Sequence, residues 1–185
     1  MGLDITAYRK LKKMDAVFNA DGEPIDPTTR EPLDYNDYAQ FYVNSDFPGR
    51  NGSIEHKAVY AYEDAHGFRA GSYGGYNGWR ERLAELAGYP TVEYERVAGY
   101  APSRQMRRDA AAWSGKCEGM PFVELVNFSD CEGVIGPEVS AKLAKDFAAF
   151  DERAKAVPDE WFYDRYCEWR KAFEMAADGG AVSFH

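Results

Sequence analysis

A glycine-rich segment at residues 71–80 has the residue types needed to bind an anion. Its four glycines permit close approach of a ligand to the backbone, and it leads into a helix whose first N–H groups could hold a phosphate or carboxylate. The polar candidates for ligand binding are Ser72, Tyr73, Asn77 and Arg80. Tyr73 would stack on a base or sugar, and Arg80 would clamp the anion. The spacing matches neither a P-loop nor a dinucleotide fingerprint, so the alternative is a turn whose Tyr76 and Trp79 belong to the core.

The polar stretch 127–138 is a second candidate. Asp130 and Glu132 would serve as general base and general acid, because two carboxylates in different environments can divide these roles. The stretch also matches the middle of a calcium loop around Gly133. Its first and last ligand positions, however, are Phe128 and Val139, which cannot ligate. We therefore predict no metal site. Cys131 would be the nucleophile in another mechanism, which would need a histidine brought close in space, because none lies nearby in sequence. The alternative to catalysis is a polar turn before a helix.

Residues 44–50 form a third candidate, because Asp46 and Arg50 lie in a loop where they could line a pocket. The alternative is a turn that satisfies its own polar groups. The three histidines, His56, His66 and His185, match no metal-binding or catalytic signature. The sequence therefore predicts no nucleophile–base pair.

The elements that must position these residues differ along the chain. Residues 3–13 alternate weakly and predict an opening strand, and residues 41–43 and 59–62 are rich in β-formers. Between them, residues 15–38 carry seven carboxylates, three prolines and one arginine, which indicates an acidic surface loop. The first third of the chain is therefore predicted to form a small antiparallel sheet.

The remainder has helical periodicity. Apolar side chains recur at steps of three and four in residues 76–86, 106–113, 139–150 and 162–176, which predicts four helices. Either Asn77 or a preceding serine would cap the first helix, and Gly88 fits its end. Residues 181–184 would return as a short strand. Together these elements predict an α+β fold, with an antiparallel sheet packed against about four helices in a single globular domain over residues 1–185.

Composition excludes several classes of protein. The net charge of −9 argues against wrapping duplex DNA, and the chain contains no run of apolar residues long enough to span a bilayer. Three widely spaced cysteines without a C-x-x-C pair predict reduced thiols in a cytoplasm. We expect no cofactor.

Four segments resemble small uncharacterised proteins of bacteriophages and prophages. They are Met1–Asp4, Gly75–Glu81, Asn127–Gly133 and Ala176–His185. The resemblance covers most of the chain and is most distinctive at Asn127–Gly133. It implies a bacterial cytoplasm and phage-linked biology, and it implies no reaction.

The sequence leaves three hypotheses about function. The preferred one is a non-catalytic binding protein that captures a host protein or a small anionic, nucleotide-like ligand, and so counters a host process such as a defence system. The second is a small hydrolase or transferase acting on a phosphate-bearing or nucleotide-like substrate, with residues 71–80 binding it and Asp130 and Glu132 catalysing. The third is a structural or assembly component that forms an oligomer.

Overall fold

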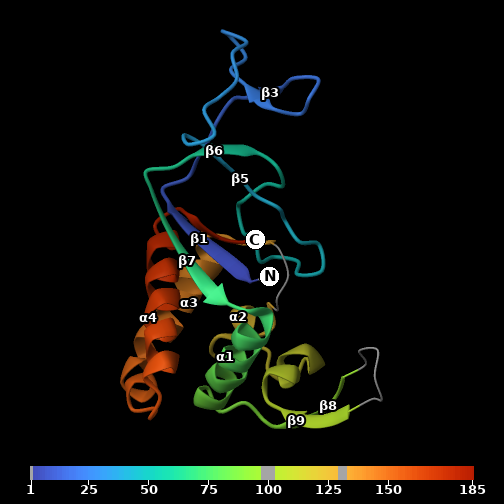
Figure 1. Cartoon of the computed structure of the whole chain (residues 1–185), viewed down its shortest axis with the longest axis vertical. Coiled ribbons are helices and arrows are strands. Elements are labelled where there is room, and N and C mark those ends of the chain that lie inside the picture. Colours follow the sequence, from blue (N-terminus) through green and yellow to red (C-terminus); the bar gives the residue numbers. More distant parts are fainter. Residues whose placement is uncertain (1, 97–102, 129–132) are drawn as a thin grey trace. The chain divides into compact units, whose positions relative to one another are not determined.

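The structure is a computed structural model that describes residues 2–96, 103–128 and 133–185 (Figure 1). It combines helices with small antiparallel sheets, which confirms the predicted α+β fold. The chain divides into two compact units. Unit 1 comprises Met1–Leu3, Arg69–Cys131 and Leu143–Arg170, and unit 2 comprises Asp4–Phe68, Glu132–Lys142 and Lys171–His185. The single domain expected from chain length stays a prediction.

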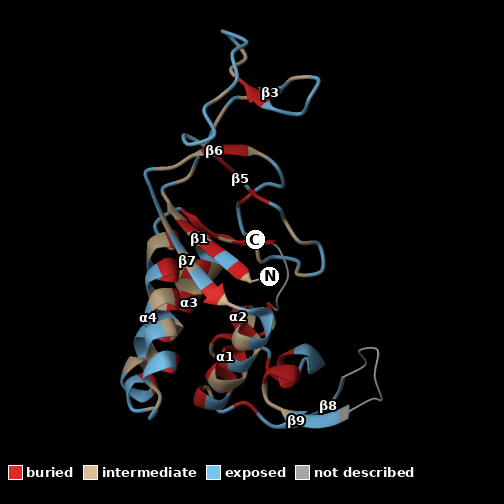
Figure 2. Cartoon of the chain, in the orientation of Figure 1, coloured by how far each residue is buried: buried red, intermediate tan, exposed pale blue. Residues whose placement is uncertain are grey.

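A four-stranded sheet joins the first and last strands of the sequence. Its spatial order is β10 (Gly133–Ile135), β11 (Ala181–Phe184), β1 (Leu3–Arg9) and β7 (Asp64–Gly71). β11 is antiparallel to both neighbours, with Ile5 opposite Phe184 and Ile135 opposite Val182. Buried positions alternate with more exposed ones at the start of β1 (Figure 2), as the period of a strand requires. The strand expected at residues 181–184 is confirmed, whereas β7 was missed because Gly67 and charged residues interrupt its pattern.

A three-stranded sheet in unit 2 has the order β2 (Lys12–Lys13), β6 (Val59–Ala61) and β5 (Ala39–Gln40). Its core includes Phe41 and Tyr60, whose ring centroids lie 5.7 Å apart. The strand predicted at residues 41–43 is wrong, because the strand in this region, β5, ends at Gln40. The N–H of Val43 donates to Nδ1 of His56 at 3.1 Å, so this backbone group bonds to a side chain instead of extending the ladder.

The acidic segment 15–38 contains a short hairpin formed by β3 (Val17–Phe18) and β4 (Pro24–Ile25). Asn19 closes its turn, since its Oδ1 accepts the N–H groups of Asp21 at 3.0 Å and Glu23 at 2.9 Å. Pro24 and Ile25 are the buried residues of this segment, and most of the others are exposed. The segment is thus an ordered surface hairpin with flanking turns.

The described part of the chain contains four α-helices: α1 (Tyr73–Leu86), α2 (Val123–Val126), α3 (Pro137–Lys155) and α4 (Glu160–Ala176). The helices predicted at residues 76–86, 139–150 and 162–176 are therefore confirmed. Their apolar faces supply the aromatic core of unit 1, in which Trp169 stacks 5.5 Å from Tyr76 and 5.6 Å from Trp79. Buried aromatic residues also use their polar atoms: the hydroxyl of Tyr76 donates to the carbonyl of Phe128 at 2.9 Å, and that of Tyr166 donates to the carbonyl of Phe147 at 2.6 Å.

Ser72 is the N-cap of α1, and Gly88, with a φ of 78°, follows its C-cap. The serine Oγ accepts the N–H of Gly75 at 3.1 Å. Ser72→Ala should lower the free energy of unfolding by about 1 kcal/mol, because this N–H loses its acceptor. Urea denaturation measures the change. Ser72→Asn keeps an acceptor and should be close to neutral, and equal losses for the two variants would contradict the capping role.

The helix predicted over residues 106–113 is wrong. Residues 92–107 form an antiparallel ribbon of β8 (Val92–Arg96) and β9 (Ser103–Arg107), followed by the 3-10 helix η1 (Asp109–Ser114). Val92 and Tyr94 alternate with Glu93 and Glu95, which is the period of a half-exposed strand. Pairing with this strand holds residues 103–107 extended, and Met106 is accordingly 63% exposed instead of lying in a core.

Candidate functional site

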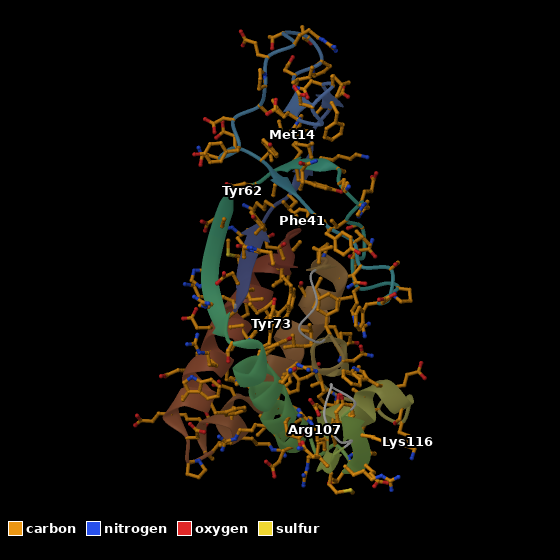
Figure 3. All side chains as sticks on the ribbon, turned by 45° about the vertical axis from the view of Figure 1, so that its right-hand side comes forward. Met14, Phe41, Tyr62, Tyr73, Arg107 and Lys116 are labelled. Atoms are coloured by element: carbon orange, nitrogen blue, oxygen red, sulfur yellow. The ribbon has the colours of Figure 1, made fainter. Side chains whose placement is uncertain are left out.

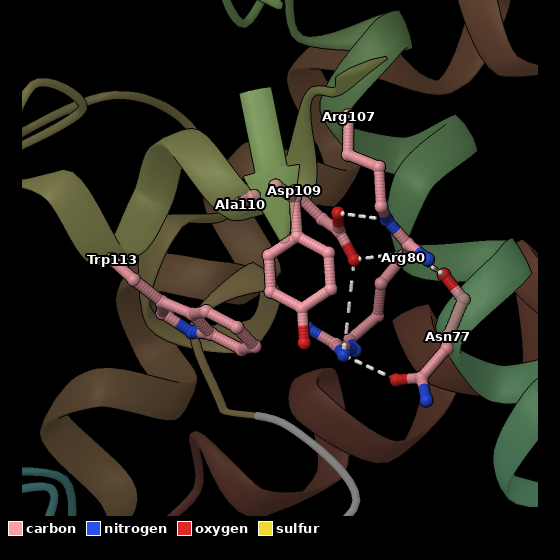
Figure 4. A pocket seen from close by; sticks show the side chains of 7 residues that line it. Asn77, Arg80, Arg107, Asp109, Ala110 and Trp113 are labelled. Carbon is pink, nitrogen blue, oxygen red and sulfur yellow. Dashed lines mark hydrogen bonds and ion pairs between the residues drawn. The ribbon is translucent and has the colours of Figure 1, made fainter. Parts of the chain in front are cut away.

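Unit 1 contains a cavity of about 210 Å³ between α1, the β8–β9 ribbon and η1 (Figure 4). Its lining is polar on one side and aromatic on the other. The lining residues are Asn77, Arg80, Tyr94, Arg107, Asp109, Ala110 and Trp113. Asn77 and Arg80 come from the glycine-rich candidate segment, so the structure places half of that predicted set in a real cavity.

Helix and strand periodicity explain why these side chains meet. Asn77 and Arg80 are three residues apart on α1 and therefore share a face. On the ribbon, Arg107 pairs with Val92, so its side chain lies on the same face as that of Tyr94. Arg104 lies on the opposite face, where it forms an ion pair with Glu93 at 3.5 Å. Arg104 and Arg107 therefore lie on opposite faces of the ribbon.

Arg80 is a buried cation, with 1% of its surface exposed. Its guanidinium donates to the carbonyl of Val126 and to Oδ1 of Asn77, and its Cζ lies 5.2 Å from the centroid of the Tyr76 ring. Burying a charge is costly unless protein groups replace its hydration. These contacts hold Arg80 rigidly, with its nitrogens at the wall of the cavity.

Asp109 joins the two arginines. Its carboxylate accepts two hydrogen bonds from Arg107, at 2.8 Å from Nε and 2.6 Å from Nη2, and lies 3.9 Å from Nη2 of Arg80 (Figure 4). The hydrogen bonds to Asp109 raise the pKa of Arg107, which therefore stays charged. Glu81 accepts the N–H groups of Arg108 and Asp109 and so fixes the start of η1.

Tyr94 and Trp113 form the aromatic side of the cavity. Their ring centroids are 6.1 Å apart with an interplanar angle of 62°, so the two rings form a corner. The indole Nε1 of Trp113 donates to the carbonyl of Asn127 at 3.2 Å, yet 48% of the residue is exposed. A planar ligand entering this corner would meet one ring with its face and the other with its edge.

The remaining candidates from the sequence lie elsewhere. Ser72 caps α1, and Tyr73 lies 38% exposed at the amino-terminal end of that helix (Figure 3). Asp46 and Arg50 belong to unit 2, in turns where the N–H of Asp46 bonds to Asn44 and the carbonyl of Arg50 accepts the N–H of Gly136 at 2.8 Å. Asp130 and Glu132 lie outside the described residues, as does Cys131.

Sequence reasoning missed Tyr94, Arg107, Asp109 and Trp113 as members of one site. The alternation in residues 92–95 was the available signal, since a strand there would have required a partner and brought residues 103–107 beside it. Asp109 carried no such signal. Asp109 can pair with Arg80 and Arg107 only because η1 places it between these two arginines, which come from different elements.

Two cysteine thiols lie within the described residues. Cys117 and Cys167 are free, and burial raises the pKa of the Cys117 thiol, which opposes its use as a nucleophile. Within residues 2–96, 103–128 and 133–185, His, Cys, Asp and Glu side chains form no group of three suited to a metal ion. None of the helices in these ranges combines the length and hydropathy needed to cross a membrane.

Comparisons with protein-family models, with curated proteins and with solved structures found no match to this chain. The cavity and the contacts around it are therefore the basis for inferring function.

Proposed function

We propose that this chain is a binding protein whose unit 1 cavity captures a small planar anion. One observation carries the proposal: two arginines and one carboxylate line the same cavity as an aromatic corner. The described residues of the lining thus have a net charge of +1, in a chain whose net charge is −9. An excess of positive charge kept in a recess of an acidic protein favours a ligand that bears negative charge.

The two arginines favour a ligand that carries hydrogen-bond acceptors. Arg80 and Arg107 are held by Val126, Asn77 and Asp109, so they need no rearrangement before a ligand arrives. Such preorganisation lowers the entropic cost of binding. Glu81 lies 3.9 Å from Nε of Arg107, but its carboxylate already accepts backbone N–H groups of η1. A carboxylate or a ring carbonyl of the ligand would therefore bind beside Arg80 and Arg107 better than a cation would.

Cavity size restricts the ligand further. At about 210 Å³ the cavity is smaller than the roughly 300–1,000 Å³ of sites for drug-sized molecules. A single ring bearing one acidic group is the appropriate class, with its ring against Trp113 and Tyr94 and its acid toward Arg107. The resemblance to phage proteins supports a ligand of the bacterial cytoplasm, whose capture would counter a host process.

Two-dimensional NMR of the indole N–H groups tests this function. Titration with benzoate, orotate and the nucleoside monophosphates should shift the Trp113 signal saturably, because these probes combine ring and charge. Uracil, which lacks the acid, and acetate, which lacks the ring, should bind at least about tenfold more weakly. Trp161 on α4, which is 44% exposed, should not respond. Absence of a saturable Trp113 response to every acidic ring would contradict the proposal.

Removing one guanidinium should weaken binding selectively. Arg107→Met should raise the dissociation constant by at least about tenfold, since a charge-assisted hydrogen bond is lost. Arg104→Met is the matched control, because Arg104 lies on the same strand but its side chain is 69% exposed and paired with Glu93. Calorimetric titration with the best probe gives both constants, and equal losses for the two variants would exclude the cavity as the binding site.

A further inference from the structure

Unit 2 contains a second recess, which the proposed function does not use. It has a volume of about 550 Å³ and is lined by Phe18, Gly22, Gln40, Phe41, Tyr42 and Lys57. Phe18 is 48% exposed and Tyr42 is 49% exposed, whereas Phe41, which also lines the recess, is buried. Exposed aromatic side chains gathered around a recess and rimmed by polar groups are typical of a protein-binding surface.

The wall that carries Phe18 is rigid. Phe18 pairs with Pro24 across the β3–β4 hairpin, and the turn between them is closed by Asn19. The N–H of Asn19 also donates to the carbonyl of Glu23 at 3.0 Å, and its Nδ2 donates to the Glu23 carboxylate at 2.9 Å. The exposed ring is thus displayed on a well-bonded turn, so a partner would not have to order it.

The same hairpin belongs to the most acidic stretch of the chain. Residues 15–38 carry seven carboxylates and one arginine, a net charge of −6 out of −9 for the whole chain. Some of these carboxylates accept backbone N–H groups of their own turns, as Asp26 does from Thr28 and Thr29. Among the described ion pairs, none involves a carboxylate of this stretch. The negative field around the recess is therefore available to a partner.

We infer that this recess, the hairpin groove, binds a basic segment of another protein through one large apolar anchor residue. The anchor would lie between Phe18 and Tyr42, and flanking lysines or arginines would lie near Asp21 and Glu23 on either side of Gly22. Lys57 disfavours a cation inside the groove, which is why the anchor itself is apolar. Charge complementarity speeds encounter and fixes orientation, and burial of the aromatic side chains supplies affinity.

The test uses the full chain and a series of labelled peptides of the form Lys-Lys-Lys-X-Lys-Lys-Lys. X is varied through Leu, Phe, Trp, Ser and Gly, and binding is followed by fluorescence anisotropy. Peptides with a large apolar X should bind at least about tenfold more tightly than the Gly peptide. Raising the salt concentration should weaken all of them, because it screens the acidic hairpin.

Variants assign the effect to the groove. Phe18→Ala should reduce the affinity for the Leu and Trp peptides by about tenfold and should remove the preference for an apolar X. Asp21→Asn combined with Glu23→Gln should flatten the salt dependence. Trp161→Ala and Asp164→Asn change an exposed aromatic residue and an exposed carboxylate of unit 1, and both should leave binding within about twofold.

Four outcomes would overturn the inference. Equal binding of the Leu and Gly peptides would show attraction by charge alone, and failure of every peptide to bind would exclude the groove. A preference for apolar X that survives Phe18→Ala would place the anchor elsewhere. Sedimentation of the free chain supplies a further check, since self-association abolished by Phe18→Ala would make a second copy of this chain the occupant. None of these results bears on the Trp113 titration, so the two sites are tested separately.

Discussion

Asp109→Ala is expected to lower the free energy of unfolding by about 3–5 kcal/mol, the range for breaking a buried ion pair from one side. The residue is 4% exposed, and its carboxylate is shared between Arg107 and Arg80. Without it, the buried Arg80 loses this ion pair and keeps its hydrogen bonds to the carbonyl of Val126 and the amide of Asn77. Guanidinium chloride denaturation measures the loss.

A double-mutant cycle tests that cause. If the cost arises from loss of the Asp109–Arg80 ion pair, then Asp109→Ala should be less damaging in the background of Arg80→Met, with a coupling energy of at least about 1 kcal/mol. Additive losses would show that other groups neutralise Arg80. Asp164→Ala, at an exposed carboxylate on α4, should change stability by no more than about 0.5 kcal/mol.

The second large effect is expected at Gly180, between α4 and β11. Its N–H donates to the carbonyl of Ala176 at 2.8 Å, and the N–H of Leu11 donates to the carbonyl of Gly179 at 2.8 Å. An added Cβ would lie 2.7 Å from the carbonyl carbon of Tyr8 and 3.1 Å from Cα of Ala176. Both are backbone atoms held by hydrogen bonds, so neither can move away cheaply. Gly180→Ala should therefore lower the free energy of unfolding by about 3 kcal/mol.

Gly78→Ala is the matched control for this substitution. Gly78 is exposed on α1, and a Cβ there would meet no atom within 4 Å. Alanine has the higher helix propensity, so this variant should be more stable than the parent chain by about 0.5–1 kcal/mol. Thermal and urea unfolding of both variants distinguish the expectations, and a Gly180→Ala protein as stable as the parent would show that the tight turn relaxes at little cost.

Local patterns in the sequence were sufficient to predict the long helices and the strands that contain an apolar run. The stripe in residues 139–150 and the run at 181–184 each contain the periodicity of their element, and both are confirmed. For residues 103–107 the local pattern predicted the wrong element. Met106 and Trp113 have helical spacing, but pairing with β8 determines the conformation of β9, and that partner cannot be read from residues 103–107 alone.

The candidate site was predicted in part, for a related reason. Asn77 and Arg80 were found because glycine, an amide and an arginine near a helix start form a local pattern. Asp109 and Tyr94 reach the same cavity from separate elements, so their roles depend on the tertiary arrangement. Arg80 was expected as a free anion clamp, whereas the structure gives it protein partners and makes it part of the cavity wall.

The position of β11 has a consequence for synthesis on the ribosome. This strand lies between β10 and β1, and it pairs Tyr8 with Ala181, residues that are more than 170 positions apart in sequence. A nascent chain cannot close this sheet until residues 181–184 have emerged, however early β1 was made. A translation product that stops at Gly180 would leave the facing edges of β1 and β10 open, and such edges invite aggregation.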